Sequence, residues 1–445
     1  MSSDLLSIGA SGTRAARIAL DVTAQNIANA ATEGYVRRST RLEEVSSAGG
    51  FNTIGDVSLS GVRLDRVVRN ADLFRQSEVR RTGADSGRAA AELNGLQNAE
   101  AAIEQSGLFD AMVRFEGALQ QLVGDPTSNA LRANVIEEAR TMAGTFNIAS
   151  AALGSVGTGL RFEAADGVSQ VNTLAQELAR VNLRLARAAD STSDQTSLLD
   201  QRDSLMQQMS GYVDVSATIN ADATVEVRLG GAAGQLLVSG GSAQPLGMTT
   251  ASDGTISFDV GGVGVAPAGG ALAGKAQALV KLVDINVTLE QIAGAMMAAV
   301  NTAQAGGVSL GGTAGQPLFA GSSAATIALA LTDPAGIATA PAGSGPGSRN
   351  AGNLDALRAA LAAADPAGAM DALLFDVSST VAGRQVTANA LNTIADTARV
   401  NLAAQAGVDL DQEAVNLVRY QQAFQASGRV MQVAQDTFNT LLGIK

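Results

Sequence analysis

The chain has 445 residues, which is enough for two to four domains with a sizeable buried core. Its 30 basic and 42 acidic residues give a net charge of −12, which disfavours a general nucleic-acid binder or a protein that coats anionic membranes. Cysteine and histidine are both absent, which excludes disulfides, thiol nucleophiles, zinc–thiolate sites and the commonest general base. We therefore expect no cofactor and no metal ion.

The first predicted element is a helix over residues 4–31. Leu6, Leu20 and Ile27 lie on one seven-residue row, and Ala16, Thr23 and Ala30 lie beside it. Residues 35–68 alternate in part between apolar and polar side chains, which predicts extended strands, with a turn at Gly49 and Gly50.

Helical patterns then dominate from about residue 71 to residue 212. A Gly-Asp-Pro-Thr-Ser segment at residues 124–128 separates two of these helices, and Ser128 is a plausible N-cap for a helix over residues 130–149. Two more helical runs follow, at residues 164–189 and 194–210. This part of the chain is therefore expected to be a helical body.

The periodicity changes to two residues between residues 213 and 265. β-branched runs alternate with Gly-Gly, Asn-Ala-Asp and Asp-Gly turns, which predicts a small antiparallel β domain inserted in the helical body. Helix is expected again over residues 276–305, followed by an irregular Gly/Pro/Ser-rich stretch at 306–350 with a short strand near 326–331. Two further helices are expected at residues 353–364 and 368–405.

The last segment carries the strongest pattern. From residue 410, apolar side chains recur every seven residues, and a second row lies three residues on. The first row is Leu410, Leu417, Phe424, Met431 and Phe438, and the second is Tyr420, Ala434 and Leu441. We expect this helix to pair with the N-terminal helix as a coiled coil, which suggests a building block of a helical assembly. Because each helix buries little area, both ends are expected to gain stability by packing on other subunits.

The expected fold is therefore mainly α, with an inserted small antiparallel β domain and paired terminal helices. We assign residues 1–60 and 406–445 to a terminal coiled-coil assembly domain. Residues 61–212 and 271–405 are assigned to a helical middle domain, and residues 213–270 to the β domain.

The sequence shows neither a secretory signal peptide nor a membrane-spanning segment. Polar and glycine residues interrupt the N-terminal apolar segment, so no secretory signal is visible. No stretch reaches the ~20 apolar residues of a membrane span. We expect no membrane insertion, and a protein that remains in the cytoplasm or leaves without a cleaved peptide.

Three patterns could carry chemistry, and each has a simpler explanation. Residues 269–276 fit a phosphate-binding loop except at Ala276, where a Ser or Thr hydroxyl is needed, so a flexible joint is favoured. Arginines between residues 63 and 88 are interleaved with acids, which favours a solvated face or ion pairs to a neighbouring subunit over nucleic acid. The carboxylate pairs at 137/138 and 409/411 lack a supporting constellation, so helix-surface charge is favoured over catalysis.

Four segments together resemble a known family. Residues 25–35 (QNIANAATEGY) resemble the N-terminal signature of bacterial flagellar rod, hook and hook-associated proteins. Residues 125–147, residues 198–205 (LLDQRDSL) and residues 408–417 (VDLDQEAVNL) with YQQAF at 420–424 are similar to segments of the hook-associated protein 1 family. The segments occur in the family's order, so the resemblance covers nearly the whole chain.

The resemblance implies a structural role and no enzyme activity. It implies a ring of copies at the junction of hook and filament, outside the cell, after type III export on an uncleaved N-terminal signal. It also implies four partners, namely other copies, hook protein, hook-associated protein 3 and a cytoplasmic chaperone on the C-terminal helix. The residues expected at the assembly interface are Leu6, Leu20, Asn26, Ile27, Asn29, Gly34, Tyr35, Leu410, Leu417, Tyr420, Phe424, Met431, Phe438 and Leu441.

Other functions remain open on the sequence. A flagellin-like filament protein or hook-associated protein 3 is the nearest alternative, although Gly34-Tyr35 and the LLDQRDSL segment argue against both. A surface adhesin that binds a ligand through the β domain is an alternative of another class. A nucleotide hydrolase or glycosidase ranks third.

Overall fold

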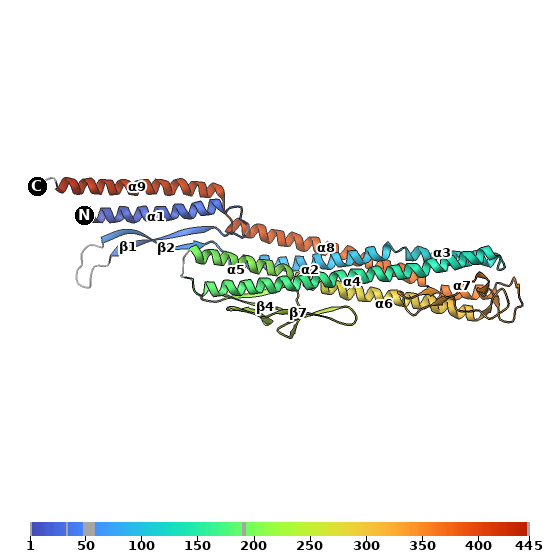
Figure 1. The fold of residues 1–445 in the computed structure, drawn as a ribbon. Coiled ribbons are helices and arrows are strands. Elements are labelled where there is room, and N and C mark those ends of the chain that lie inside the picture. The colour runs from blue at the N-terminus through green and yellow to red at the C-terminus, as the bar shows by residue number, and fades with distance from the viewer. Residues whose placement is uncertain (1, 33, 48–57, 189–192, 443–445) are drawn as a thin grey trace. The chain divides into compact units, whose positions relative to one another are not determined.

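The protein is mainly α-helical with small antiparallel sheets, as expected (Figure 1). The computed structural model describes residues 2–32, 34–47, 58–188 and 193–442. The helices in these ranges are α1 (Ser2–Ala28), α2 (Leu73–Glu104), α3 (Leu108–Gly124), α4 (Asn129–Leu185), α5 (Ser193–Tyr212), α6 (Gly270–Ala305), α7 (Gly352–Ala364), α8 (Pro366–Ala406) and α9 (Leu410–Leu442). The expected turn at Gly49 and Gly50 lies outside the described residues.

The strands pair only with antiparallel neighbours in the described ranges. They are β1 (Arg38–Ser47), β2 (Ser58–Arg69), β3 (Val215–Ile219), β4 (Val225–Leu229), β5 (Gln235–Ser239), β6 (Ser242–Ala243), β7 (Leu246–Thr250), β8 (Ile256–Val260), β9 (Val263–Val265), β10 (Gly307–Val308), β11 (Phe319–Ala320), β12 (Ala328–Leu329) and β13 (Ala340–Pro341). The β segment forms two sheets, β3-β4-β5-β6 and β7-β8-β9, rather than one.

The chain divides into two compact units. The terminal unit takes residues 1–84, 171–245 and 392–445, and the central unit takes residues 85–170 and 246–391. The sheet β3–β6 belongs to the terminal unit and the sheet β7–β9 to the central unit. The three-domain boundaries expected from the sequence stay a prediction.

In the terminal unit, α1 and α9 lie side by side and run in opposite directions (Figure 1). Gly9 faces Ser427 and Met431, where an added Cβ would come within 2.7 Å of the Met431 side chain. At the other end of α1, Asn26 bonds to Glu413 at the start of α9. Small residues therefore bring the two backbones close, which is consistent with the predicted pairing of the terminal helices.

The hairpin β1–β2 packs on α1. The Ser11 hydroxyl donates to the carbonyl of Ile8 and accepts from the backbone N–H of Val62, which joins the helix to β2. Gly61 has φ +98°, and a side chain there would collide with Ser11. The close approach of strand and helix therefore requires glycine at this position.

One predicted break in the helical body does not occur. The two helices expected at residues 130–149 and 164–189 are a single 57-residue helix, α4. The glycines between them are tolerated because Leu153 and Leu160 remain buried, so packing outweighs their low helix propensity. Ser128 caps α4 as predicted, since its hydroxyl accepts from the N–H of Leu131 at 3.4 Å.

The central unit has an apolar core and an irregular segment tied to it by side chains. Phe115 on α3 packs edge-on against Phe319, with ring centroids 6.0 Å apart. Residues 306–350 form only two-residue strands, as the Gly/Pro/Ser-rich composition predicted. The backbone of this segment bonds instead to the side chains of Arg132, Asn147, Asn301, Gln304 and Asn353.

Candidate assembly interface

A tight turn follows α1 in the terminal unit. The N–H of Thr32 donates to the carbonyl of Asn29, and the N–H of Tyr35 donates to the carbonyl of Thr32. Gly34 has φ +78°, a conformation that favours glycine. The turn reverses the chain so that β1 begins beside the end of α1.

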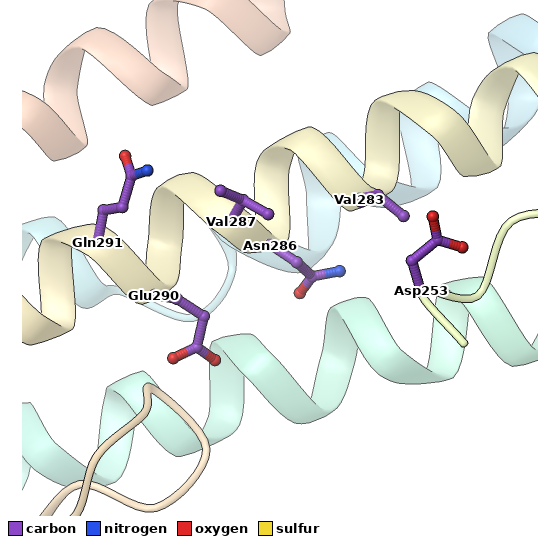
Figure 2. Close-up of a pocket in the computed structure, with 6 residues that line it drawn as sticks. All are labelled: Asp253, Val283, Asn286, Val287, Glu290 and Gln291. Carbon is purple, nitrogen blue, oxygen red and sulfur yellow. The ribbon is translucent and has the colours of Figure 1, made fainter. Parts of the chain in front are cut away.

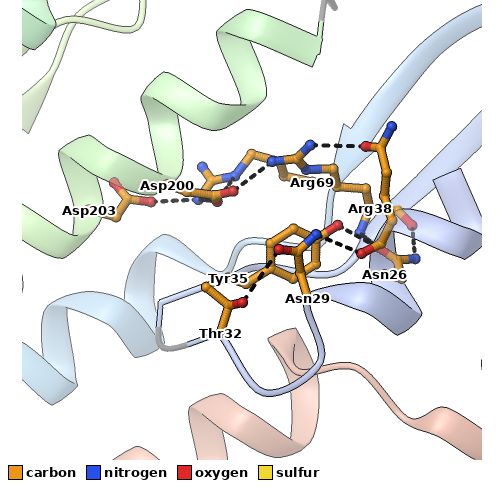
Figure 3. Close-up of polar contacts among 9 residues, drawn as sticks. Asn26, Asn29, Thr32, Tyr35, Arg38, Arg69, Asp200 and Asp203 are labelled. Carbon is orange, nitrogen blue, oxygen red and sulfur yellow. Dashed lines mark hydrogen bonds and ion pairs between the residues drawn. The ribbon is translucent and has the colours of Figure 1, made fainter.

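Asn26 is the centre of this turn (Figure 3). Its side chain is 1% exposed, and its amide both donates to the carbonyl of Arg38 at 2.8 Å and accepts from the N–H of Arg38 at 3.0 Å. The Tyr35 hydroxyl donates to the same amide oxygen at 2.9 Å. Burial raises the pKa of Tyr35, which keeps this hydroxyl a neutral donor although the Arg38 guanidinium opposes the shift. The Asn26 side chain thus bonds to both backbone groups of Arg38, the first residue of β1, as a neighbouring strand would.

Glu413 links the turn to α9. Its carboxylate is 1% exposed and accepts from Asn26 at 3.2 Å and from the Arg37 guanidinium at 2.7 Å. The backbone N–H of Arg37 donates to the carbonyl of Ala406, the last residue of α8. A buried carboxylate requires such partners, because an unpaired charge in this position would be strongly destabilising.

A second set of buried charges joins β1, β2 and α5 (Figure 3). The Asp200 carboxylate accepts from Arg38 and Arg69, each at 2.9 Å. The Asp203 carboxylate accepts from Arg69 at 3.0 Å and from Arg202 at 2.7 Å. The Arg38 guanidinium also lies 5.0 Å from the centre of the Tyr35 ring, a cation–π distance.

The electrostatics of Asp203 follow from this geometry. Burial by itself would raise the pKa of Asp203, but the guanidinium groups of Arg202 and Arg69 together lower it below its usual value. The carboxylate is therefore held ionised inside the terminal unit.

Three of the segments that carry the family resemblance meet here. Residues 25–35 form the turn, residues 198–205 supply Asp200 and Asp203, and residues 408–417 supply Glu413. Neither Arg38 nor Glu413 was among the residues predicted from the sequence to have a role. The sequence does contain a signal for Glu413. It lies seven residues before Tyr420, so it puts a charge in the row of α9 that contains Tyr420 and Ala434.

The two rows of α9 differ in exposure. Ala434 is 1% exposed and Tyr420 is half-buried, so the second row faces inward. In the first row, Leu417 and Met431 are half-buried, whereas Leu410, Phe424 and Phe438 are 40–54% exposed. The side chain of Leu441 lies outside the described residues. Much of the apolar surface of α9 is therefore left uncovered.

The predicted row of α1 is also the more exposed one. Leu6 and Ile27 are 41% and 36% exposed, and Leu20 is half-buried. The buried side of α1 is formed by Ala15, Ala16, Ala19, Val22, Thr23 and Asn26. Asn29 is half-buried and bonds to the carbonyl of Gln25, and Gly34 is exposed. The large apolar residues expected to pair with α9 are thus half-buried or exposed, and the close contact with α9 is made at Gly9 and Gly12.

The patterns that suggested nucleotide or nucleic-acid binding have structural roles. Residues 270–276 are the first turns of α6, and Gly274 lies against the backbone of Arg88 and Glu92 on α2, so this segment is not a flexible joint. Among the arginines, Arg63 pairs with Glu43 at 2.8 Å, and Arg69 is buried on the Asp200 and Asp203 carboxylates. These partners belong to the same chain.

The carboxylate pairs are likewise engaged. Glu137 and Glu138 pair with Arg140 and Arg114, and the Asp409 side chain caps α9 by accepting from the N–H of Asp411. No cluster of three or more candidate metal ligands is found in the described ranges.

A pocket of about 460 Å³ in the central unit is lined by Asp253, Val283, Asn286, Val287, Glu290 and Gln291 (Figure 2). Its two carboxylates are occupied within the chain. Asp253 accepts from the N–H and hydroxyl of Thr255, and Glu290 accepts from the N–H of Ala324 at 2.7 Å. These bonds order loops, and leave few polar groups for a ligand.

Two models of flagellar protein families match the segments that contain most of α1 and all of α9. The profile described as "Flagella basal body rod protein" matches residues 6–35, and "Flagellar basal body rod FlgEFG protein C-terminal" matches residues 403–444. The profile "Flagellar hook-associated protein FlgK helical domain" matches residues 93–319, half of the chain. The chain belongs to the FlgK family. FlgK proteins are flagellar structural proteins and not enzymes.

Relatives named flagellar hook-associated protein 1 support the assignment to the FlgK family. The *Bacillus subtilis* (strain 168) protein is 29% identical over 214 residues, which covers 46% of this chain and 42% of the relative. The *Escherichia coli* (strain K12) protein is 26% identical over 337 residues, covering 72% and 60%. This chain therefore spans about half the length of the relatives it matches.

A solved structure from the FlgK family is also similar. It is the flagellar hook junction protein FlgK from *Burkholderia pseudomallei*, with a TM-score of 0.49 and 23% identity over 55% of this chain and 46% of that chain. Among the described residues, no helix has the length and apolar character that a membrane span requires.

Proposed function

We propose that this chain is a subunit of the bacterial flagellum that forms a ring at the junction of hook and filament. In this proposal, copies assemble outside the cell through α1 and α9 after type III export without a cleaved signal peptide. The direct partners are other copies, the hook protein and hook-associated protein 3, and a cytoplasmic chaperone holds α9 before export.

One observation carries the proposal. Membership of the FlgK family comes together with an apolar surface on the paired terminal helices that the chain itself leaves uncovered. Leu410, Phe424 and Phe438 are 54%, 40% and 52% exposed, and Val415 and Val433 on the same helix are 63% and 61% exposed. These side chains lie on more than one side of α9, and exposed apolar surface of this kind marks protein–protein interfaces. Subunits that pack in a tube would cover these side chains.

The hydrogen bonds and the ion pair between the end of α1 and the start of α9 support the same assembly role. The Asn26, Arg37 and Glu413 contacts fix the two helices relative to each other without using their outer apolar side chains. The assembly residues predicted from the sequence therefore divide into two groups. Asn26, Asn29, Gly34 and Tyr35 set the turn, and the exposed leucine and phenylalanine side chains remain for neighbours, whereas Met431 packs against Gly9 of α1.

Immunogold electron microscopy of intact flagella from the source cell tests the proposal. A single band of label at the distal end of the hook is expected. Label along the whole filament would indicate a flagellin-like protein instead. Absence of label from flagella would remove the assembly role and favour an adhesin or an enzyme.

A variant extends the test to the interface. Phe424→Asp should abolish the band because a carboxylate would be buried between subunits. Met431→Asp should abolish it because the carboxylate would lie against Gly9 of α1, and in both variants the central unit stays folded. Phe162→Asp, which changes a phenylalanine of α4 that is 76% exposed, is the matched control and should leave the band in place. Normal incorporation of Phe424→Asp would show that this helix face is not an assembly surface.

A further inference from the structure

The terminal unit contains an open groove on the side of β1, β2 and α5. The groove has a volume of about 440 Å³, and Val67, Leu73, Leu199 and Ile219 contribute to its apolar lining. Its basic lining residues are Arg41, Arg66, Arg69 and Arg202, and none of the described lining residues is acidic. A positively charged, partly apolar groove is unusual on a chain with a net charge of −12.

The four arginines differ in how far they are neutralised. Arg69 and Arg202 are buried on Asp200 and Asp203, as described above. Arg41 and Arg66 are 66% and 50% exposed, and among the described residues their ion-pair partner is Asp65, at 3.8 and 3.4 Å. Exposed pairs at such distances contribute little free energy. The two exposed guanidiniums therefore remain available to an acidic partner.

A matching feature occurs at the start of α9. Leu410 is 54% exposed, and both neighbours, Asp409 and Asp411, are exposed acids. Within the described residues neither carboxylate forms an ion pair, and one oxygen of Asp409 caps the helix. The corner between α8 and α9 thus presents an apolar side chain between two negative charges.

Other exposed apolar residues match the groove less well. Phe162 and Phe375 also have acidic neighbours, but Glu163 and Asp376 pair with Lys275 and Lys281. Their charge is therefore already neutralised within the chain. Leu410 combines an exposed apolar side chain with flanking carboxylates that form no ion pair within the described residues.

We propose that the groove of one copy receives Leu410 of a second copy, with Asp409 and Asp411 facing Arg41 and Arg66. The contact is heterologous, because groove and Leu410 are different surfaces of one chain, and repeated heterologous contacts generate rings or helical arrays. This inference rests on the proposed assembly in the flagellum and names one subunit contact within it.

Disulfide cross-linking tests the contact, because the natural chain has no cysteine. Intact flagella that carry both Val67→Cys and Leu410→Cys are oxidised and then run on a denaturing gel. This pair should give disulfide-linked oligomers of the chain. The control is Val67→Cys with Val418→Cys, since Val418 lies on the same helix and is 52% exposed. We expect about tenfold more cross-linked product from the first pair, in line with the steep distance and geometry limits of disulfides.

The outcomes separate the contact from the proposed function. If immunogold places the chain at the hook end and the two pairs cross-link equally, or neither does, the groove contact is wrong while the junction role stands. If the chain is absent from flagella, both proposals fall.

A charge exchange gives a second test that is independent of cysteine substitution. Arg66→Glu alone should reduce incorporation about tenfold because like charges would face each other, and Arg66→Glu with Asp411→Arg should restore it. The contact is wrong if the double variant recovers no incorporation while the single Asp411→Arg variant is incorporated normally.

Discussion

The terminal and central units are stabilised in different ways. The core of the central unit is apolar, with Phe115, Met142, Phe146 and Leu153 fully buried. The terminal unit also has an apolar core, in which Leu178, Val213 and Val225 are fully buried. It adds buried ion pairs and hydrogen bonds where α1, β1, α5 and α9 meet, and leaves large apolar side chains of α9 exposed. Directional bonds therefore fix the end of α1 against its neighbours, and the exposed side chains of α9 are free for contacts with other chains.

This difference has a thermodynamic consequence. Apolar packing contributes about 25 cal/mol per Å² of buried area, whereas a buried ion pair contributes little net stability and is costly when one partner is lost. The central unit should tolerate changes that conserve volume, and the terminal unit should be sensitive to the loss of single hydrogen-bonding groups.

The largest effect is expected at Arg132, a fully buried charged side chain of the central unit. Arg132 is 0% exposed, and its guanidinium donates to the carbonyls of Pro126 and Ile337 and to the Thr339 hydroxyl. Arg132→Ala should cost about 3–5 kcal/mol, because several buried acceptors lose their donor together. Urea denaturation measures the change, and hydrogen exchange at residues 334–339 locates it.

Arg114→Ala is the control for Arg132. Arg114 is 51% exposed and pairs with Glu138 at 3.4 Å, so its loss should cost about 0–1 kcal/mol. Similar costs for the two variants would mean that the buried guanidinium does not hold the irregular segment.

A smaller effect is expected at the turn of the terminal unit. Asn26→Ala removes the partner of the Tyr35 hydroxyl, the Arg38 backbone and Glu413, and should cost about 2–3 kcal/mol. Asn29→Ala, in the same turn but with bonds at the surface, should cost about 1 kcal/mol or less. Thermal unfolding compares the pair, and equal losses would contradict the central role of Asn26.

Acid should weaken the terminal unit before the central unit. Arg202 and Arg69 keep the native pKa of Asp203 below its unfolded value of about 3.9. Its contribution to stability is therefore fully present above that unfolded value and is lost as pH falls through the lower native value. Hydrogen exchange of α5 as a function of pH checks the direction, and Asp203→Asn should flatten the profile. An unchanged profile in that variant would show that other carboxylates control acid unfolding.

The smallest effect on folding is expected at the exposed row of α9. Phe438→Ala should cost about 1 kcal/mol or less, because the side chain is 52% exposed and loses few contacts. The same change should nevertheless reduce incorporation of the chain into flagella. The number of immunogold particles per flagellum measures that reduction. A cost as large as that of Asn26→Ala would mean that Phe438 belongs to the core of the terminal unit.

Much of the fold follows from periodicity. The terminal helices, α7, α8 and most strands lie where the pattern of apolar residues placed them, because helix and strand periods differ clearly over long segments. The continuity of α4 was not predictable, since Gly154, Gly157 and Gly159 have low helix propensity and only tertiary packing overrides it.

The site was harder to predict than the fold. Seven-residue rows identified α9 as a packing helix, but large apolar residues were assumed to face α1. At the contact, Gly9 and Gly12 of α1 lie against Ser427 and Met431 of α9, so only Met431 belongs to the predicted row. Close backbone approach depends on small side chains, which carry no hydrophobic signal. The pairing of Arg38 and Asp200 crosses 162 positions in sequence, and local patterns contain no information about such partners.

The bond between Asn26 and Glu413 joins residues 387 positions apart, and this separation determines when the terminal unit can be completed. A chain that emerges from its N-terminus, from a ribosome or from any narrow channel, presents α1 long before α9 arrives. During that interval Asn26 and Arg37 have no Glu413 to bond, and the small-residue side of α1 remains open to solvent. Because contacts of long sequence separation form late, closure of α1 on α9 should be the last folding event and the slowest one.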